Sequence, residues 1–186
     1  MEVSERGLVI GCGNPCRGDD GVGLIAVERL RRRWHQGMPG CLQPGTSGTL
    51  ELVPAPLQAL ELIELFDHRP FCVLLDAVEA GLRPGTIVRW SCAGGQASAA
   101  QQPEAWPASR HAPGSLHGWD VGSTLALARA LGRALPARFT ILGVQIDQRC
   151  LWGKRLSPAV EQALPELLER AVAEVVEALS CMNCRW

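Results

Sequence analysis

The stretch Gly11–Gly23, with the sequence GCGNPCRGDDGVG, places the strongest constraint on the fold of this chain. The apolar run Gly7–Ile10 leads into it, and apolar residues at helical spacing follow it from Val22 to Leu30. A strand, a glycine-rich turn and the start of a helix therefore lie together. This order predicts a strand–turn–helix unit at the beginning of an α/β fold.

The residues of this turn argue against a phosphate site. Cys16 holds the third glycine position of a dinucleotide fingerprint, and no Gly-Lys-Ser/Thr sequence follows the turn. Asp19 and Asp20 stand where the helix begins, and their charges would repel a phosphate there. Two interpretations remain open: both acids cap the helix, or the loop presents negative charge to a cation.

The remaining pattern alternates strands with helices. We expect strands at Leu8–Gly11, Phe71–Leu75, Thr86–Trp90 and Phe139–Ile146, a weak one at Cys41–Gln43, and helices over Asp20–Trp34, Leu57–Phe66, Val121–Leu135 and from Ser157 onward, broken near Pro165. This alternation predicts an α/β fold with a mainly parallel, twisted sheet of about five strands and helices on both faces. We expect one domain over residues 1–186, in a three-layer arrangement like that of phosphorylases and hydrolases.

Composition excludes several classes of function. The formal net charge is −1, and the cluster Arg31–Arg33 lies at a helix end, so we expect no nucleic-acid partner. No apolar run reaches the length of a membrane span, and the polar N-terminus lacks the features of a signal peptide, which predicts a cytoplasmic protein with no membrane partner.

Two segments and the cysteines need separate interpretation. We expect Ser91–Gly114 to be a flexible insertion or lid, because it has no useful apolar period. We expect Cys181–Trp186 to be a flexible tail, in which the Cys181-x-x-Cys184 pair is no zinc site. The eight cysteines suit reduced thiols. Cys12 and Cys16 are nucleophiles only in principle, since no histidine base is near them in the sequence.

Two acids and a histidine form a candidate site. Ligands of open α/β sheets bind beyond the carboxyl ends of the strands, where Asp20 and Asp76 each follow a predicted strand. His117 precedes a predicted helix, and His111 is a rival. Each residue alone has an ordinary explanation as a cap, a turn acid or a surface histidine. Together, carboxylate oxygen and imidazole nitrogen suit a first-row divalent metal, and this small set suits a metal that arrives and leaves with a partner.

A series of motifs in this order carries a resemblance to a known family. They are Gly11-x-Gly13-Asn14 through Asp19-Asp20-Gly21-x-Gly23, Gly45-Thr46-x-Gly48, Asp76-Ala77-Val78, Pro84-Gly85-Thr86, Ser115-x-His117, Leu142-Gly143-Val144 and Leu156-Ser157-Pro158-x-Val160-Glu161. With them the chain resembles the hydrogenase maturation proteases, the endopeptidases that trim the large subunit of nickel–iron hydrogenases. One departure is that Gln43 stands about where the family often has an acid.

The resemblance implies a substrate and a site. The partner would be the nickel-loaded precursor of a hydrogenase large subunit, which loses a short C-terminal extension after a basic residue. Asp20, Asp76 and His117 would contact the nickel, which the substrate supplies, and no organic cofactor is implied. Three alternatives stay open: a non-catalytic nickel-sensing chaperone of the same precursor, a hydrolase with a permanent metal, and a nucleotide-dependent oxidoreductase.

Overall fold

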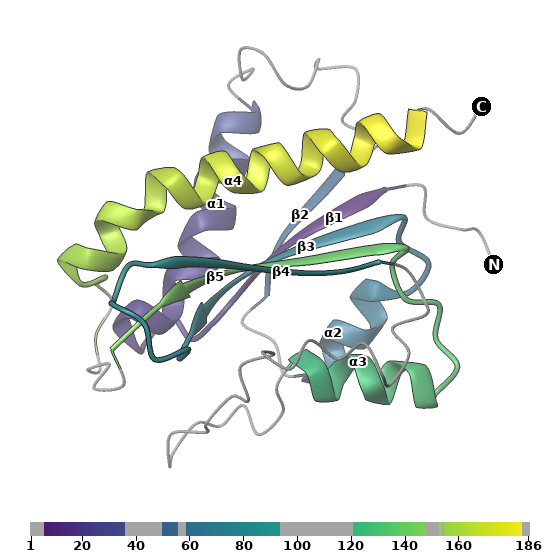
Figure 1. Cartoon of the computed structure of the whole chain (residues 1–186), viewed down its shortest axis with the longest axis horizontal. Coiled ribbons are helices and arrows are strands. Elements are labelled where there is room, and N and C mark those ends of the chain that lie inside the picture. The colour runs from purple at the N-terminus through teal and green to yellow at the C-terminus, as the bar shows by residue number, and fades with distance from the viewer. Residues whose placement is uncertain are drawn as a thin grey trace.

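The structure is a computed structural model that describes residues 6–35, 50–55, 59–93, 121–147, 153 and 155–183. Its strands are β1 (Gly7–Cys12), β2 (Leu50–Ala55), β3 (Phe71–Val78), β4 (Ile87–Ala93) and β5 (Arg138–Gln145). They form one sheet in the order β2-β1-β3-β5-β4 (Figure 1). The pairs β1–β2, β1–β3 and β3–β5 are parallel, and β4 runs antiparallel to β5. The predicted α/β fold class is confirmed.

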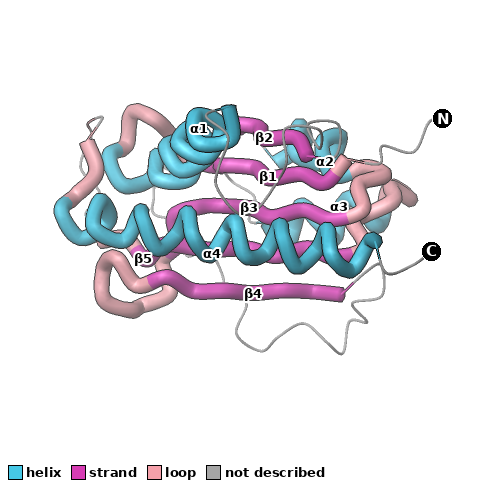
Figure 2. The backbone as a smooth tube through the Cα atoms, turned by 90° about the horizontal axis from the view of Figure 1, so that it is seen from above, coloured by secondary structure: helices cyan, strands magenta, loops and turns pink. Residues whose placement is uncertain are grey.

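Helices cover both faces of the sheet. They are the 3-10 helix η1 (Gly18–Gly21) and the α-helices α1 (Val22–His35), α2 (Ala59–Phe66), α3 (Val121–Ala130) and α4 (Pro158–Asn183). Helices α1 and α4 lie on one face, and α2 and α3 lie on the other (Figures 1 and 2). Seen from above, α4 runs along the sheet over β3 and β5, and α1 lies toward β1 and β2 (Figure 2).

Alternate strand residues build two cores, because successive side chains of a strand point to opposite faces. The buried strand residues against α1 and α4 include Val9, Val73, Leu75, Leu142 and Val144. Those against α2 and α3 include Leu8, Ile10, Cys12, Cys72, Leu74, Phe139 and Ile141. Strands buried on both faces read as continuous apolar runs, which is why β1, β3 and β5 were visible in the sequence.

Two predicted boundaries around β3 and β4 were wrong. Strand β3 does not stop before Asp76, since its ladder with β5 continues from Asp76↔Gly143 to Val78↔Gln145. Strand β4 continues to Ala93, paired with Arg138, so the first three residues of the expected lid 91–114 belong to the sheet. The rest of that segment, and the weak strand expected at Cys41–Gln43, lie outside the described residues.

The helix ends also differ from the expectations. Helix α3 ends at Ala130, not Leu135, because the N–H of Gly132, at a φ of 68°, and the N–H of Arg133 bond back to the carbonyls of the last turn. Helix α4 passes through Pro165 unbroken. Pro165 faces solvent while Leu164 and Leu167 are fully buried, so packing holds both halves of the helix to the sheet. No described helix is long and apolar enough to cross a membrane.

The first three residues of the expected tail 181–186 belong to α4. Cys181 belongs to the last turn of α4, where it is exposed and free, and only residues 184–186 lie outside the described part.

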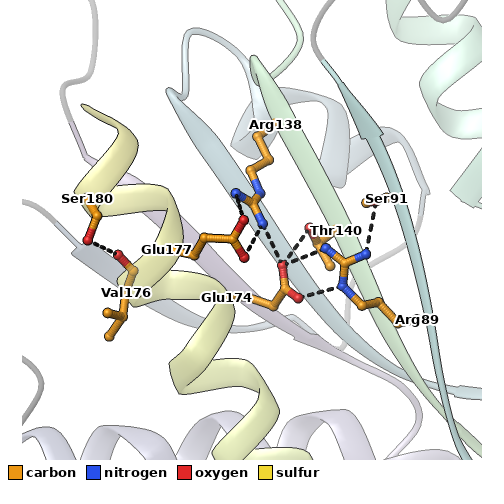
Figure 3. A network of polar contacts seen from close by, with 8 residues as sticks. All are labelled: Arg89, Ser91, Arg138, Thr140, Glu174, Val176, Glu177 and Ser180. Atoms are coloured by element: carbon orange, nitrogen blue, oxygen red, sulfur yellow. Dashed lines mark hydrogen bonds and ion pairs between the residues drawn. The ribbon is translucent and has the colours of Figure 1, made fainter. Parts of the chain in front are cut away.

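A polar network ties α4 to the antiparallel edge of the sheet (Figure 3). Glu174 of α4 accepts hydrogen bonds from Arg89 of β4 at 2.5 and 3.1 Å, and from Arg138 and Thr140 of β5 at 3.1 and 3.2 Å. Arg138 also donates to Glu177 at 3.0 Å. Because the Glu174 side chain is only 10% exposed, these contacts satisfy a carboxylate that is almost removed from water.

Candidate functional site at the carboxyl edge of the sheet

The carboxyl ends of β1, β2, β3 and β5 meet at one edge of the sheet, where the loop 13–20 leaves β1. Gly13 in this loop has a φ of 131°, and a Cβ there would collide with the carbonyl oxygen of Asp20. A Cβ on Gly23 would collide with the carbonyl oxygens of Leu75 and Cys12. The glycines of the first motif therefore let the start of α1 pack directly on β1 and β3, beside Asp76.

Asp20 and Asp76 are each fixed by one backbone N–H. Asn14 donates to Oδ2 of Asp20 at 3.1 Å, and Ala77 donates to Oδ1 of Asp76 at 2.8 Å. Both residues are half-buried. Asp76 continues the alternation of Cys72 and Leu74, which places it on the face that α2 and α3 cover.

The environment of Asp76 disfavours its negative charge. Burial raises the pKa of Asp76 to about 7, the hydrogen bond from Ala77 opposes this rise, and the charge of Asp20 adds to it. The helix η1, which holds Asp20, packs against β3, which holds Asp76, so the structure brings these two acids, 56 positions apart in the sequence, to the same place. A pair of half-buried like charges favours either a shared proton or a bound cation.

His117 and His111 both lie outside the described residues. Within the described residues, no group of three or more His, Cys, Asp and Glu side chains is arranged to hold a metal ion. The described part of the candidate site is thus the pair Asp20 and Asp76. For carboxylate oxygens, a divalent cation is a chemically suitable guest.

Asp19 and Asp20 have different hydrogen-bond partners. Its side chain is 7% exposed, and its Oδ1 accepts a hydrogen bond at 2.5 Å from the N–H of Ser157, directly before α4. The N–H of Gly18 and the carbonyl of Cys16 both bond to Gly153, so the first loop is also joined to that segment by its backbone. Asp19 therefore caps α4 from across the molecule, which the sequence pattern did not reveal.

We predict that Asp19→Ala lowers the free energy of unfolding by about 1–2 kcal/mol, because it removes a buried acceptor from the start of α4. Asp19→Asn keeps a side-chain oxygen at that place, so its loss should be smaller. Urea unfolding of the two variants measures both effects. An equal and large loss in both would mean that the charge, rather than the acceptor, is what matters.

Cys12 lies beside Asp76 at the end of β1. Burial, followed by the negative charge of Asp76, raises the pKa of the Cys12 thiol well above its usual value. A nucleophilic cysteine needs its thiolate form. The location of Cys12 therefore argues against its acting as a nucleophile, which was one of the possibilities open from the sequence.

The raised pKa of Asp76 predicts a dependence of stability on pH. Between the unfolded value of about 4 and the folded value of about 7, the folded protein binds more protons than the unfolded chain. Stability should therefore fall as the pH rises through this window, by roughly 1–4 kcal/mol, and level off above it. Urea unfolding of the metal-free protein at pH 5 and pH 8 measures this difference. Asp76→Asn should remove most of it, and an unchanged difference in that variant would assign the effect to other groups.

A groove of about 590 Å³ lies beside the first loop. Pro15 of the loop and Pro54 of β2 line it, together with Leu24, Ile25 and charged residues of α1. Its apolar walls and charged rim offer room for a segment of polypeptide.

Comparison with known proteins identifies the family of this chain. A profile described as hydrogenase maturation protease matches residues 40–174. The chain belongs to the hydrogenase maturation protease family. This match covers more than half of the chain, and the predicted family is confirmed.

Individual relatives agree with this membership. The hydrogenase expression/formation protein HupD of Thiocapsa roseopersicina is 29% identical over 165 residues, which cover 89% of this chain and 65% of HupD. HoxM of Azotobacter vinelandii, with the same description, is 30% identical over 175 residues, which cover 89% of this chain and 73% of HoxM. The chain thus spans about two thirds to three quarters of the length of these relatives.

A solved structure shows the same fold. The hydrogenase maturating endopeptidase HybD from E. coli superposes with a TM-score of 0.67 at 24% identity, over 93% of both chains. The mainly parallel sheet with helices on both faces is therefore the fold of this maturation protease family.

The sequence analysis assigned no structural role to two residues at this edge, Ser157 and Gln145. Ser157 stood in a family motif, but its partner Asp19 is 138 positions away. Gln145 is a polar residue at the end of an apolar strand, a signal that could have drawn attention to it, and it is 4% exposed.

Proposed function

We propose that the protein is an endopeptidase that removes the C-terminal extension of a nickel-loaded precursor of a nickel–iron hydrogenase large subunit. Family membership supports the class of activity. The single observation that carries the site assignment is that η1, which holds Asp20, packs against β3, which holds Asp76, at the carboxyl edge of the sheet. In this proposal the nickel belongs to the substrate, and the protein needs no organic cofactor.

Asp20 and Asp76 recognise the nickel of the loaded precursor. Each has one oxygen held by a backbone N–H, which orients the carboxylate, and no hydrogen bond to the other oxygen comes from the described residues. A cation between them relieves the repulsion of two half-buried charges. The nickel polarises the scissile carbonyl or activates a water, and a carboxylate acts as general base.

His117 is proposed as the third contact to the nickel. It stands four positions before Val121, the first residue of α3, and α3 covers the face to which Asp76 points. Helix α3 ends shortly before β5 begins at the amino edge, so its first turn points back toward the carboxyl edge. The sequence position of His117 before α3 is what supports its proposed role.

The precursor of the hydrogenase large subunit is the proposed partner, and the cytoplasm is the proposed location. The groove lined by Pro15 and α1 is the proposed place for the chain next to the scissile bond, because Pro15 belongs to the same loop as Asp20. If cleavage requires nickel at this site, the protein would cut only the precursor that already carries its metal.

The test is incubation of purified protein with purified large-subunit precursor, followed by the intact mass of the precursor and the metal content of the protein. We expect one discrete loss of mass at the C-terminus, from a protein that carries no stoichiometric metal of its own. Stable binding without a change of mass would instead identify a chaperone. A tightly bound stoichiometric metal in the protein alone would identify a permanent-metal hydrolase.

A further inference from the structure

The end of β3 that carries Asp76 is paired on one side. Strand β1 pairs with β3 as far as Leu75, whereas the ladder with β5 continues from Asp76 to Val78. Within the described part of the chain, β5 is therefore the strand that holds this end of β3. Strand ends with few partners open more readily than the centre of a sheet. The position of the Asp76 carboxylate thus depends on the contacts that close the ladder beyond it.

The side chain of Gln145, the last residue of β5, makes such contacts. Gln145 pairs with Val78 and is 4% exposed. Its Oε1 accepts hydrogen bonds from the N–H groups of Ala80 and Leu82, in the loop after β3, at 2.7 and 3.3 Å. Its Nε2 donates to the carbonyl of Ile146 at 2.6 Å, which sets the orientation of the amide. One buried side chain therefore joins the end of β5 to the loop 79–86.

Backbone hydrogen bonds hold the two ends of the same loop. The N–H of Ile146 donates to the carbonyl of Val78 at 3.0 Å, at the end of β3. The N–H of Gly85 donates to the carbonyl of Gln145 at 2.8 Å, and the N–H of Gln145 donates to the carbonyl of Thr86 at 2.9 Å. The side chain of Gln145 thus adds the support inside a loop whose ends the ladder already fixes. Its removal leaves these backbone bonds in place.

Val78 connects this support to the surroundings of Asp76. Gly143 lies opposite Asp76 in the ladder, and a Cβ on it would approach Cγ1 of Val78 to 2.5 Å and Cζ3 of Trp90 to 3.1 Å. Carbon atoms of Val78 and Trp90 therefore fill the space beside Asp76 on the β5 side. Such a wall offers a carboxylate no hydrogen bond, and this favours the orientation in which Oδ1 accepts from the N–H of Ala77.

We propose that Gln145 is a positioning residue for the cleavage reaction, whose side-chain amide keeps Val78 and the loop 79–86 in place and so keeps the Asp76 carboxylate in its productive orientation. The inference rests on the proposed function and adds a residue that acts through Asp76. Without the amide, Val78 moves away from Gly143 and the carboxylate gains other orientations. Fewer bound precursors then meet Asp76 in reactive geometry, which lowers kcat rather than binding.

The first test compares Gln145→Met, which keeps the length of the side chain and removes its hydrogen bonds, with the matched control Thr140→Val. Thr140 is also a buried polar residue of β5, but it pairs with Val73 and its hydroxyl serves Glu174. We expect Gln145→Met to lower kcat for nickel-loaded precursor about tenfold with KM changed less than twofold. Thr140→Val should keep both constants. Equal kcat values for the two variants would overturn the proposal.

A second variant breaks the same contact from the loop. Ala80→Pro removes the N–H that Oε1 of Gln145 accepts and leaves Gln145 in place. It should also lower kcat, and adding it to Gln145→Met should lower kcat by less than the product of the two separate effects, because both act through one hydrogen bond. Effects that multiply in full would contradict a shared route.

Amide exchange at Ala77 provides a readout that does not depend on cleavage, because the Asp76 carboxylate itself accepts this N–H. Exchange should be about tenfold faster in Gln145→Met than in wild type and unchanged in Thr140→Val. An unchanged rate in Gln145→Met would overturn the proposal even if kcat falls. If wild type cuts the precursor and Gln145→Met has the same kcat, the inference fails and the proposed function stands. If wild type does not cut it, the proposed function fails, and the exchange rate still decides whether Gln145 orients Asp76.

Discussion

Asp76→Asn should reduce cleavage of nickel-loaded precursor by roughly 100-fold or more. The amide keeps the shape of the carboxylate and one oxygen that can accept the Ala77 N–H. It has no charge to offer nickel and cannot accept a proton at neutral pH. The measurement is the initial rate at which the shortened subunit forms, followed by intact mass.

The same substitution should not damage the fold. Since the environment of Asp76 disfavours a negative charge, the metal-free variant should be more stable than wild type at pH 8. An inactive but stabilised variant separates a chemical role from a structural one. Asp19→Asn is the neighbouring control and should keep most of the activity, because Asp19 contacts Ser157. Full activity in Asp76→Asn, or a greater loss in Asp19→Asn than in Asp20→Asn, would contradict the assignment.

Glu174→Ala should lower the free energy of unfolding by about 2–4 kcal/mol. It leaves Arg89, Arg138 and the buried Thr140 hydroxyl without their common acceptor. The estimate lies at the lower end for a buried ion pair because Arg89 and Arg138 are 42% and 25% exposed and regain some hydration. Chemical denaturation at pH 7 measures it.

Glu166→Ala is the matched control on the same helix. Glu166 also pairs with an arginine, Arg170, but both side chains are about half exposed, so the loss should stay within about 0.5 kcal/mol. Burial acts to raise the pKa of Glu174, but its hydrogen bonds with Arg89 and Arg138 outweigh this and lower it. The stability that Glu174 contributes is therefore present above its pKa in the unfolded chain. It is lost as the pH falls through its lower pKa in the folded protein. Equal losses for Glu174→Ala and Glu166→Ala would show that the network adds no stability.

The layers of the fold could be predicted because β1, β3 and β5 are central strands that read as continuous apolar runs. The pairing of β4 with β5 could not, because the short loop 79–86 turns β4 back against the direction of β3, whereas the strand that separates the two comes much later in the sequence. The end of β3 was missed because Asp76 looks like a turn residue, whereas its pairing with Gly143 keeps it in the ladder.

The candidate site shows the same division between local and long-range information. The pair Asp19 and Asp20 was visible as two acids at a helix start, which left open whether they cap the helix or present charge to a cation. That Asp19 accepts a hydrogen bond from Ser157, directly before α4, depends on a contact across 138 positions. Glu174 carried a sequence signal that went unused: it lies between Ala171, Val175 and Ala178 on the buried face of α4, where a charge needs a partner.

The central claim is that Asp20 and Asp76 bind the nickel of the loaded precursor and so recognise it. The most direct measurement is the intact mass of nickel-loaded and nickel-free precursor after incubation with wild type, Asp20→Asn and Asp76→Asn. The account predicts a discrete loss of mass only for the nickel-loaded precursor with wild type. Equal trimming of the nickel-free precursor, or trimming by Asp76→Asn at the wild-type rate, would contradict it.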